Sequence, residues 1–302
     1  MGIPIKKISF ALLFNQRANN MKYPIGIQSF EKLREGGYVY VDKTPLIYSL
    51  THEGCVYFLR RPRRFGKSLL VSTLKSYYLG RKDLFKGLAM EELEQEWKIY
   101  PVFHLDFGTG TYGNAHALDQ VLDSYLSEWE EQYQVKRRPN ITDFSLRFKK
   151  IIEEAHRQSG LRAFYSTFKV ADEHLQFVLL TGVTKFSQVS VFSDFNQPND
   201  ISMDVKYDAL CGITDEEIDR YFTSSVVEMA DIYGCSAEEM RDLLRKRFDG
   251  YHFSKRMRGV YNPFSLLNTF MKLDMQDYWF RTGTPLLISF DCSIISTRIS
   301  TR

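Results

Sequence analysis

The chain has 302 residues, of which 44% are hydrophobic and 15% aromatic, so it is long enough for about two domains and apolar enough to build real cores. A net charge of +3 is too small to indicate nucleic-acid binding by itself, and the four cysteines lack the Cys-x-x-Cys spacing of a zinc site. The longest N-terminal apolar run, Ile8 to Phe14, is too short to span a bilayer and lacks a small-residue cleavage site. We therefore expect a soluble protein of the reducing cytoplasm.

In chain order, the first predicted elements surround a basic loop. Residues 38–42 are predicted to be extended and residues 43–50 to form a short helix. An apolar strand begins at Val56 and runs into the loop, after which Gly66-Lys-Ser opens a helix with an apolar face of Leu70, Leu74, Tyr77 and Tyr78. A strand, a short loop and a helix opened by Gly-Lys-Ser are typical of a phosphate-binding loop.

Each residue type in this loop has a role in binding a nucleotide. Gly66 lets backbone N–H groups approach a β-phosphate, Lys67 reaches the β- and γ-phosphates from a solvent-facing position, and Ser68 is the expected Mg2+ ligand. The positive end of the helix points at the anion. The usual pattern has a glycine where this chain has Arg61, so the alternative is a basic strand-to-helix turn. The predicted nucleotide contacts are Arg63, Arg64, Phe65, Gly66, Lys67, Ser68 and Leu69.

The middle of the chain is predicted to alternate strands and helices. A second buried strand is expected at 100–107, and apolar stripes mark helices from Leu118 to Trp129 and from Phe144 to Ala155. Gly160 is the stop signal of the second of these helices, and another apolar strand spans residues 177–182.

The chain beyond this strand is predicted to be mostly helical. Two capping boxes, Thr214-x-x-Glu217 and Ser236-x-x-Glu239, stand ahead of apolar runs, and Gly250 is expected to close the second helix. These signals indicate a helical C-terminal subdomain.

Six segments together resemble the signature blocks of the bacterial AAA-ATPase-like family, whose members often carry a C-terminal PD-(D/E)XK nuclease-like domain. The resemblance covers residues 21 to about 285 and implies a P-loop fold that binds ATP with Mg2+: an α/β parallel sheet with flanking helices, plus a helical C-terminal part. The segments are Tyr23-Pro-Ile-Gly-Ile-Gln-Ser-Phe, Tyr40-Val-Asp-Lys-Thr, Arg61-Pro-Arg-Arg-Phe-Gly-Lys-Ser, Leu180-Thr-Gly-Val-Thr-Lys-Phe, Phe248-Asp-Gly-Tyr-His-Phe and Tyr261-Asn-Pro-Phe-Ser-Leu-Leu.

One expected element of such a fold is missing from the sequence. The strand order of these ATPases predicts a third strand ending in acidic residues just after Gly160, yet residues 161–170 read as helical. The next strand, 177–182, already resembles the family's sensor strand. We infer that a strand-helix unit of about 30 residues is absent between Arg162 and Ala163. The alternative is a divergent member with a short connection.

Four further polar residues near the strands are weaker candidates. Asp106 imitates a Walker B acid, but the strand count places it on the second strand, at the sheet edge, where a turn or cap role is favoured. Thr181 and Lys185 end the sensor-like strand and either orient the attacking water or form a simple turn. His104, inside an apolar strand, is expected to be a satisfied core histidine.

Two denser clusters have both a functional and a structural interpretation. The polar cluster of Asp249, Tyr251 and His252 has the residue types of a catalytic site. The favoured interpretation is that these residues end a helix and form a packed turn. The arginines of loop 60–64 could grip phosphates, contact DNA or reach a neighbouring subunit. No catalytic residue is assigned.

The predicted organisation has four parts: an N-terminal extension at 1–20, an AAA-ATPase-like P-loop domain at 21–212, a helical lid-like subdomain at 213–285 and a tail at 286–302 that adds no stability. The predicted function is ATP binding with Mg2+, with hydrolysis impaired because the Walker B acid is absent. The alternative is a non-hydrolysing module that binds nucleic acid or a protein partner through loop 60–64.

Overall fold

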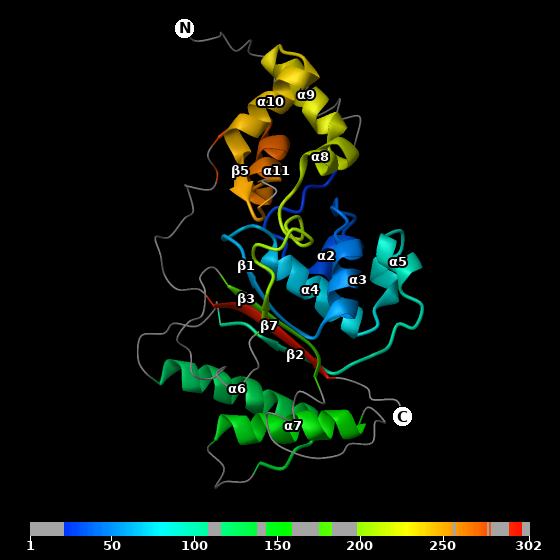
Figure 1. Ribbon diagram of the computed structural model, residues 1–302, viewed down its shortest axis with the longest axis vertical. Coiled ribbons are helices and arrows are strands. Elements are labelled where there is room, and N and C mark those ends of the chain that lie inside the picture. The colour runs from blue at the N-terminus through cyan, green and yellow to red at the C-terminus, as the bar shows by residue number, and fades with distance from the viewer. Residues whose placement is uncertain are drawn as a thin grey trace.

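A computed structural model of the protein describes the residues 21–107, 116–137, 143–158, 175–182, 198–255, 258–276, 278 and 290–297. They form a mixed α/β arrangement in which a sheet lies between two groups of helices, with further helices gathered at the top of the view in Figure 1. The inferred deletion at 162/163, Gly160 and Lys185 lie outside the described residues.

The five-stranded sheet has the order β2-β7-β3-β1-β4. Strand β1 (Val56–Arg60) pairs in parallel with β3 (Leu175–Gly182) and with β4 (Asn199–Asp200). Strand β2 (Val102–Leu105) lies at the edge, as the sequence predicts for the strand that leads to Asp106. The fifth strand, β7 (Phe290–Thr297), is antiparallel to both β2 and β3.

Strand β7 corrects two expectations. The sheet is not wholly parallel, and the tail does not lie outside the fold, because residues 290–297 occupy the place between β2 and β3 where the missing strand was expected. The register pairs Ile294 with both His104 and Leu179. Two parallel strands separated by one strand width leave backbone N–H and C=O groups that need partners, and an added strand supplies them whatever its direction.

Helices cover both faces of the sheet, as Figure 1 shows. One face packs against α2 (Phe30–Glu35), α3 (Thr44–Glu53) and α4 (Lys67–Tyr78), with η1 (Lys82–Phe85) and α5 (Ala89–Leu93) beside them. The other face packs against α6 (Ala117–Gln132) and α7 (Phe144–Gln158).

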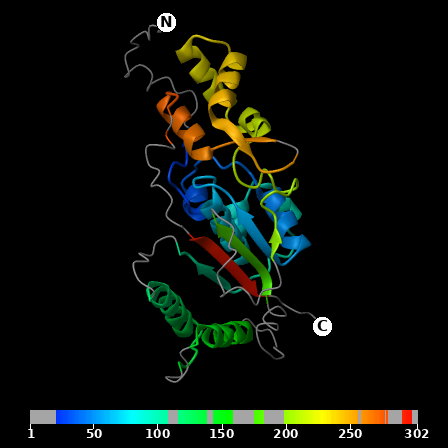
Figure 2. The same cartoon turned by 60° about the vertical axis from the view of Figure 1, so that its left-hand side comes forward.

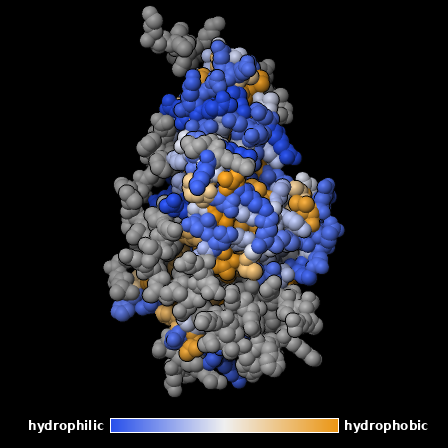
Figure 3. All heavy atoms as spheres, in the orientation of Figure 1, coloured by the Kyte–Doolittle hydropathy of each residue, from blue (hydrophilic) through white to orange (hydrophobic). Residues whose placement is uncertain are grey.

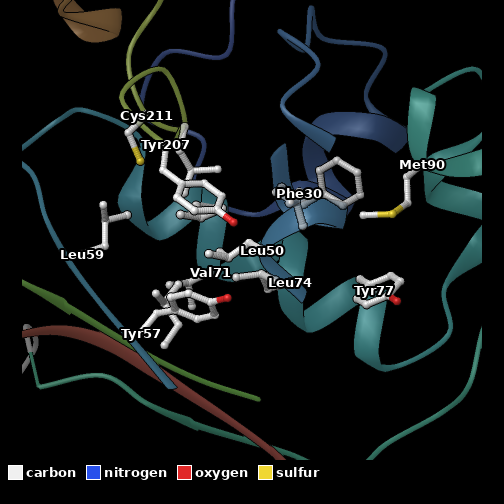
Figure 4. Close-up of a cluster of buried hydrophobic side chains, with 14 of the residues drawn as sticks. Phe30, Leu50, Tyr57, Leu59, Val71, Leu74, Tyr77, Met90, Tyr207 and Cys211 are labelled. Atoms are coloured by element: carbon white, nitrogen blue, oxygen red, sulfur yellow. The ribbon is translucent and has the colours of Figure 1, made fainter. Parts of the chain in front are cut away.

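The side chains of β1 explain why the strand is apolar throughout. Tyr57 and Leu59 belong to the core on the α4 side, whereas Phe58 belongs to the core on the α6 and α7 side. Successive side chains of a strand point to opposite faces, so a strand covered on both sides reads as a continuous apolar run. Figure 4 shows Val71 and Leu74 of α4 next to Tyr57. This packing fixes where the loop between β1 and α4 lies.

The C-terminal helices form a second core of their own around Phe222, Met240 and Phe270. Figure 2 shows them above the sheet, and the surface over α8 to α10 is mainly hydrophilic in Figure 3. Their elements are α8 (Asp215–Tyr221), α9 (Thr223–Tyr233), α10 (Ala237–Phe248), α11 (Pro263–Lys272) and a hairpin of β5 (Asp249–His252) and β6 (Gly259–Tyr261).

Both predicted capping boxes are present. The Thr214 and Ser236 side chains accept hydrogen bonds from the backbone N–H groups of Glu217 and Glu239, whose carboxylates accept in return from the N-cap backbone. The prediction for Gly250 is wrong. Helix α10 ends at Phe248, and Gly250 lies in β5, because the chain turns directly into the hairpin.

Candidate nucleotide-binding site

The loop between β1 and α4 lies at the carboxyl edge of the parallel strands. Gly66 is the N-cap of α4, with a φ of 92° and no side-chain hydrogen bond to the first turn. Glycine is the residue that adopts this left-handed backbone at no steric cost, and a Cβ built at Gly66 would meet nothing within 4 Å. The start of α4 is therefore a positive helix end whose N-cap residue has no side chain to cap the first turn.

Lys67 does not face solvent, which corrects the sequence expectation. Its side chain is folded back over the loop, so that only 3% of the residue is exposed. The Nζ donates hydrogen bonds to the carbonyl oxygens of Arg61 and Pro62, both at 3.1 Å. These acceptors are neutral, so the bonds leave the charge of the ammonium at the loop.

The other predicted contacts divide into an accessible group and a packed group. Arg63, Ser68 and Leu69 are partly exposed around the loop and the first turn of α4. Phe65 is buried, and its ring packs edge-on against Tyr251 with the centroids 4.6 Å apart. The guanidinium of Arg64, which has a φ of 66°, stacks 4.1 Å from the ring centroid of Phe264.

Arg61 is part of the core. It is 0% exposed, and its guanidinium donates to the carbonyl oxygens of Arg60 and Ser202 at 2.8 Å and of Tyr207 at 2.9 Å. The guanidinium also lies 4.2 Å from the ring centroid of Phe253. Burial lowers the pKa of Arg61. The guanidinium of Arg61 therefore cannot bind a phosphate or DNA, because its N–H donors already bond to backbone carbonyls of neighbouring loops. The interpretation of loop 60–64 as a basic surface required Arg61 to be accessible.

The Phe248–Phe253 block packs against the phosphate loop. Besides the Tyr251 contact, the ring of Phe253 lies 5.4 Å from that of Phe65 in an edge-on arrangement. The backbone N–H of Gly212 donates to the Phe65 carbonyl at 3.2 Å, which ties the next segment to the same loop. These contacts agree with the packed turn favoured from sequence, and His252 is exposed.

An apolar cavity of about 100 Å³ opens beside Gly66. It lies where the N-terminal segment, the first turn of α4 and the C-terminal helices meet, and Lys43 is the charged residue in its lining. The apolar lining includes Val39, Val41, Leu69, Ile213, Phe222 and Leu267. A concave, mainly apolar site with one charged residue suits an apolar or aromatic ligand group.

Sequence reasoning missed the role of the Tyr40–Thr44 block. Asp42 accepts hydrogen bonds from the backbone N–H groups of Thr44 and Ala89, both at 2.9 Å, and so joins the starts of α3 and α5. Lys43 lies between the cavity and Glu217 of α8, with its Nζ 2.6 Å from Oε1. The block was visible as a family signature, but the partner is 174 residues away along the chain.

Of the weaker candidates, Asp106 and His104 lie on or next to β2, at the edge of the sheet, whereas Thr181 lies beside the loop. The backbone of Asp106 exchanges hydrogen bonds with the Tyr125 hydroxyl, at the sheet edge. Thr181 is buried in β3 and pairs with Leu59. His104 is not fully satisfied as predicted, since its Nε2 has no hydrogen-bond partner within the described residues, and burial lowers its pKa.

The mixed α/β sheet with flanking helices is compatible with an AAA-like fold. Residues 24–161 match the family described as "Predicted AAA-ATPase", which confirms over that segment the resemblance stated from sequence. No solved structure matches the chain. Among the described helices, none has the length and apolar character needed to cross a membrane.

A relative in Azotobacter chroococcum mcd 1, described as "Uncharacterized protein in vnfD 5'region", is 36% identical over 300 residues, which covers 88% of this chain and 55% of the relative. The chain thus spans about half the length of that protein. The comparison spans 300 aligned positions, but 88% of this chain is only about 266 residues. Roughly 34 aligned positions of the relative therefore have no counterpart in this chain.

Proposed function

We propose that this protein binds ATP with Mg2+ at the loop between β1 and α4. The observation that carries the proposal is the left-handed Gly66 at the start of α4, with the Lys67 ammonium held over the loop, in a segment that matches a predicted ATPase family. The β- and γ-phosphates lie against the first N–H groups of α4 and Lys67. Ser68 ligates Mg2+, Arg63 reaches the outer phosphate, and the base enters the apolar cavity.

We propose further that hydrolysis is impaired. In a P-loop ATPase, an acid at the end of the third strand would hold Mg2+ and position water. Strand β7 runs antiparallel to β3, so its first residues, and not its last, lie at the sheet edge next to the loop. Within the described ranges, no three His, Cys, Asp or Glu side chains converge as a metal site. The 34 or so positions without a counterpart agree in size with a lost strand-helix unit of about 30 residues.

The competing proposal is a module that binds DNA or a protein partner through loop 60–64, without nucleotide. Arg61 is buried, whereas Arg60 is exposed and Arg63 and Arg64 are partly exposed, with the Arg64 guanidinium stacked on Phe264. The loop therefore presents fewer than the four charges that the sequence offers. The geometry therefore favours nucleotide binding over this alternative.

Calorimetric titration with MgATP tests the proposal. Lys67→Ala should raise the Kd at least tenfold, because the variant loses a charge-assisted contact to phosphate. Lys75→Ala is the matched control, since Lys75 is an exposed lysine of the same helix. Binding that is equal in the three proteins, or absent from the unmodified chain, contradicts the proposal. Lys67→Ala also loses two intramolecular hydrogen bonds, so its melting temperature must be recorded beside the Kd.

Steady-state turnover tests the impairment. We expect a kcat well below the median of about 10 s⁻¹ for enzymes. Asp291 is the acidic residue of β7, and its backbone is in register with Thr181 at the loop edge. A normal turnover that is lost in both Lys67→Ala and Asp291→Asn would show that β7 supplies the acid, and the impairment proposal would be wrong.

A further inference from the structure

Lys43 is a buried cation at the junction of the sheet domain and the C-terminal helices. It is the N-cap residue of α3, and 11% of its side chain is exposed. Its Nζ lies 2.6 Å from Oε1 and 2.7 Å from Oε2 of Glu217. Glu217 Oε2 also accepts from the backbone N–H of Thr214 at 2.9 Å, so this carboxylate is held on α8 by its capping box.

Lys43 lines the cavity beside the phosphate loop. Lys43 shares the lining with Gly66 and Leu69, whereas the rest of the lining is mainly apolar. Burial lowers the pKa of Lys43, and the charge of Glu217 opposes this effect. An ammonium has three N–H donors and no acceptor. The pair with Glu217 fixes the direction of the ammonium.

A ligand group that enters the cavity therefore meets one fixed donor among apolar side chains. A phosphate there would lose the N–H groups of α4 and would be buried among Val39, Val41 and Phe222, so the phosphates stay at Gly66. A planar heterocycle suits the apolar lining, and its ring nitrogens are acceptors. Both bases carry an exocyclic amino group, but guanine adds an N1–H donor where adenine has an acceptor. This extra donor would need an acceptor in the cavity, whereas Glu217 is already engaged by Lys43 and Thr214.

We propose that Lys43, held by Glu217, is a specificity-determining residue that donates to a ring nitrogen of the adenine base and favours adenine over guanine nucleotides. This inference rests on the proposed nucleotide site and assigns the base contact within it. The base also meets a residue bonded to α8, so the C-terminal helices take part in recognising the ligand.

The test compares three probes by calorimetry: MgATP, MgGTP and magnesium tripolyphosphate, which has no base. Lys43→Met should weaken MgATP at least tenfold, leave tripolyphosphate unchanged and reduce the preference for ATP over GTP. Lys67→Ala should weaken all three probes. Lys32→Met, on the exposed surface of α2, is the matched control and should change none of them.

A structural role for Lys43 predicts a different pattern. Lys43→Met leaves the Glu217 carboxylate unpaired, so the double variant Lys43→Met/Glu217→Gln, which removes both charges, is measured with it. Equal weakening of MgATP and tripolyphosphate, or unchanged MgATP affinity in both variants, overturns the base contact while the nucleotide site stands. Binding of none of the probes by the unmodified chain would instead overturn the proposed function, and the base contact with it.

Discussion

Replacing Arg61 should destabilise the protein more than any other change in the phosphate loop. Arg61→Met keeps much of the side-chain volume but removes the guanidinium that donates to the carbonyl oxygens of Arg60, Ser202 and Tyr207. The Tyr207 carbonyl keeps the backbone N–H of Leu210 as a donor at 3.1 Å. An unsatisfied buried polar group costs about 1 to 3 kcal/mol, so the other two would cost up to about 6 kcal/mol. Part of this cost is offset, because the substitution also removes an unfavourably buried guanidinium. The Nε of that guanidinium has no hydrogen-bond partner within the described residues. We expect a net loss of about 3 kcal/mol.

Urea unfolding monitored by circular dichroism measures this loss, which corresponds to roughly 6 to 12 °C in melting temperature for a chain of this size. Arg60→Met is the matched control, because the Arg60 side chain is exposed and its bonds to Arg61 and Ser202 come from the backbone, which the substitution keeps. Its effect should stay within about 0.5 kcal/mol. Equal unfolding midpoints for the two variants would refute the argument that Arg61 acts in the core. Loss of nucleic-acid binding by Arg61→Met without loss of stability would favour the basic-loop alternative.

Two more predictions concern stability. Deletion of residues 286–302 should lower the melting temperature by several degrees, against the sequence expectation, since residues 290–297 pair with both β2 and β3; an unchanged melting temperature would contradict the place of β7. Burial, with the charge of Asp215 adding to it, raises the pKa of Asp249, so its ionised form disfavours folding at pH 7. Asp249→Asn should therefore melt higher than the unmodified chain at pH 7, and the difference should vanish as the pH falls through the raised pKa to below about 4. A difference that is independent of pH would point to packing instead.

The elements that local signals specify were predictable. The strand at Val56, the helix that opens after Gly66 and the two capping boxes follow from short patterns, because their physical causes lie within a few residues. The structure has each of them. The edge position of β2 followed from counting the strands along the chain.

The roles that depend on distant partners were not predictable from the residues alone. Arg61 bonds Ser202 and Tyr207, 141 and 146 residues away, and nothing in the basic loop distinguishes it from Arg60 or Arg63. The same holds for β7, because the Ser and Thr residues of 290–297 weaken its apolar pattern. A strand joins a sheet where backbone groups need partners, and that need depends on the positions of β2 and β3.

The loop departs from the usual phosphate-binding pattern at one position, and the structure gives the physical reason. Where a glycine would let the loop turn tightly by itself, Arg61 joins the loop to the segment 202–207 and stacks on Phe253, while Phe65 packs on Tyr251. The loop is thus fixed by contacts with residues outside it. Ser202 and Tyr207 precede the C-terminal helical part, and Tyr251 and Phe253 belong to it. Because Lys43 and Glu217 connect the same part to the cavity, a ligand at Gly66 would contact a loop and a cavity that the C-terminal helices help to shape. Binding measurements on fragments that lack residues 213–275 should therefore show weaker affinity even though every predicted phosphate contact is retained.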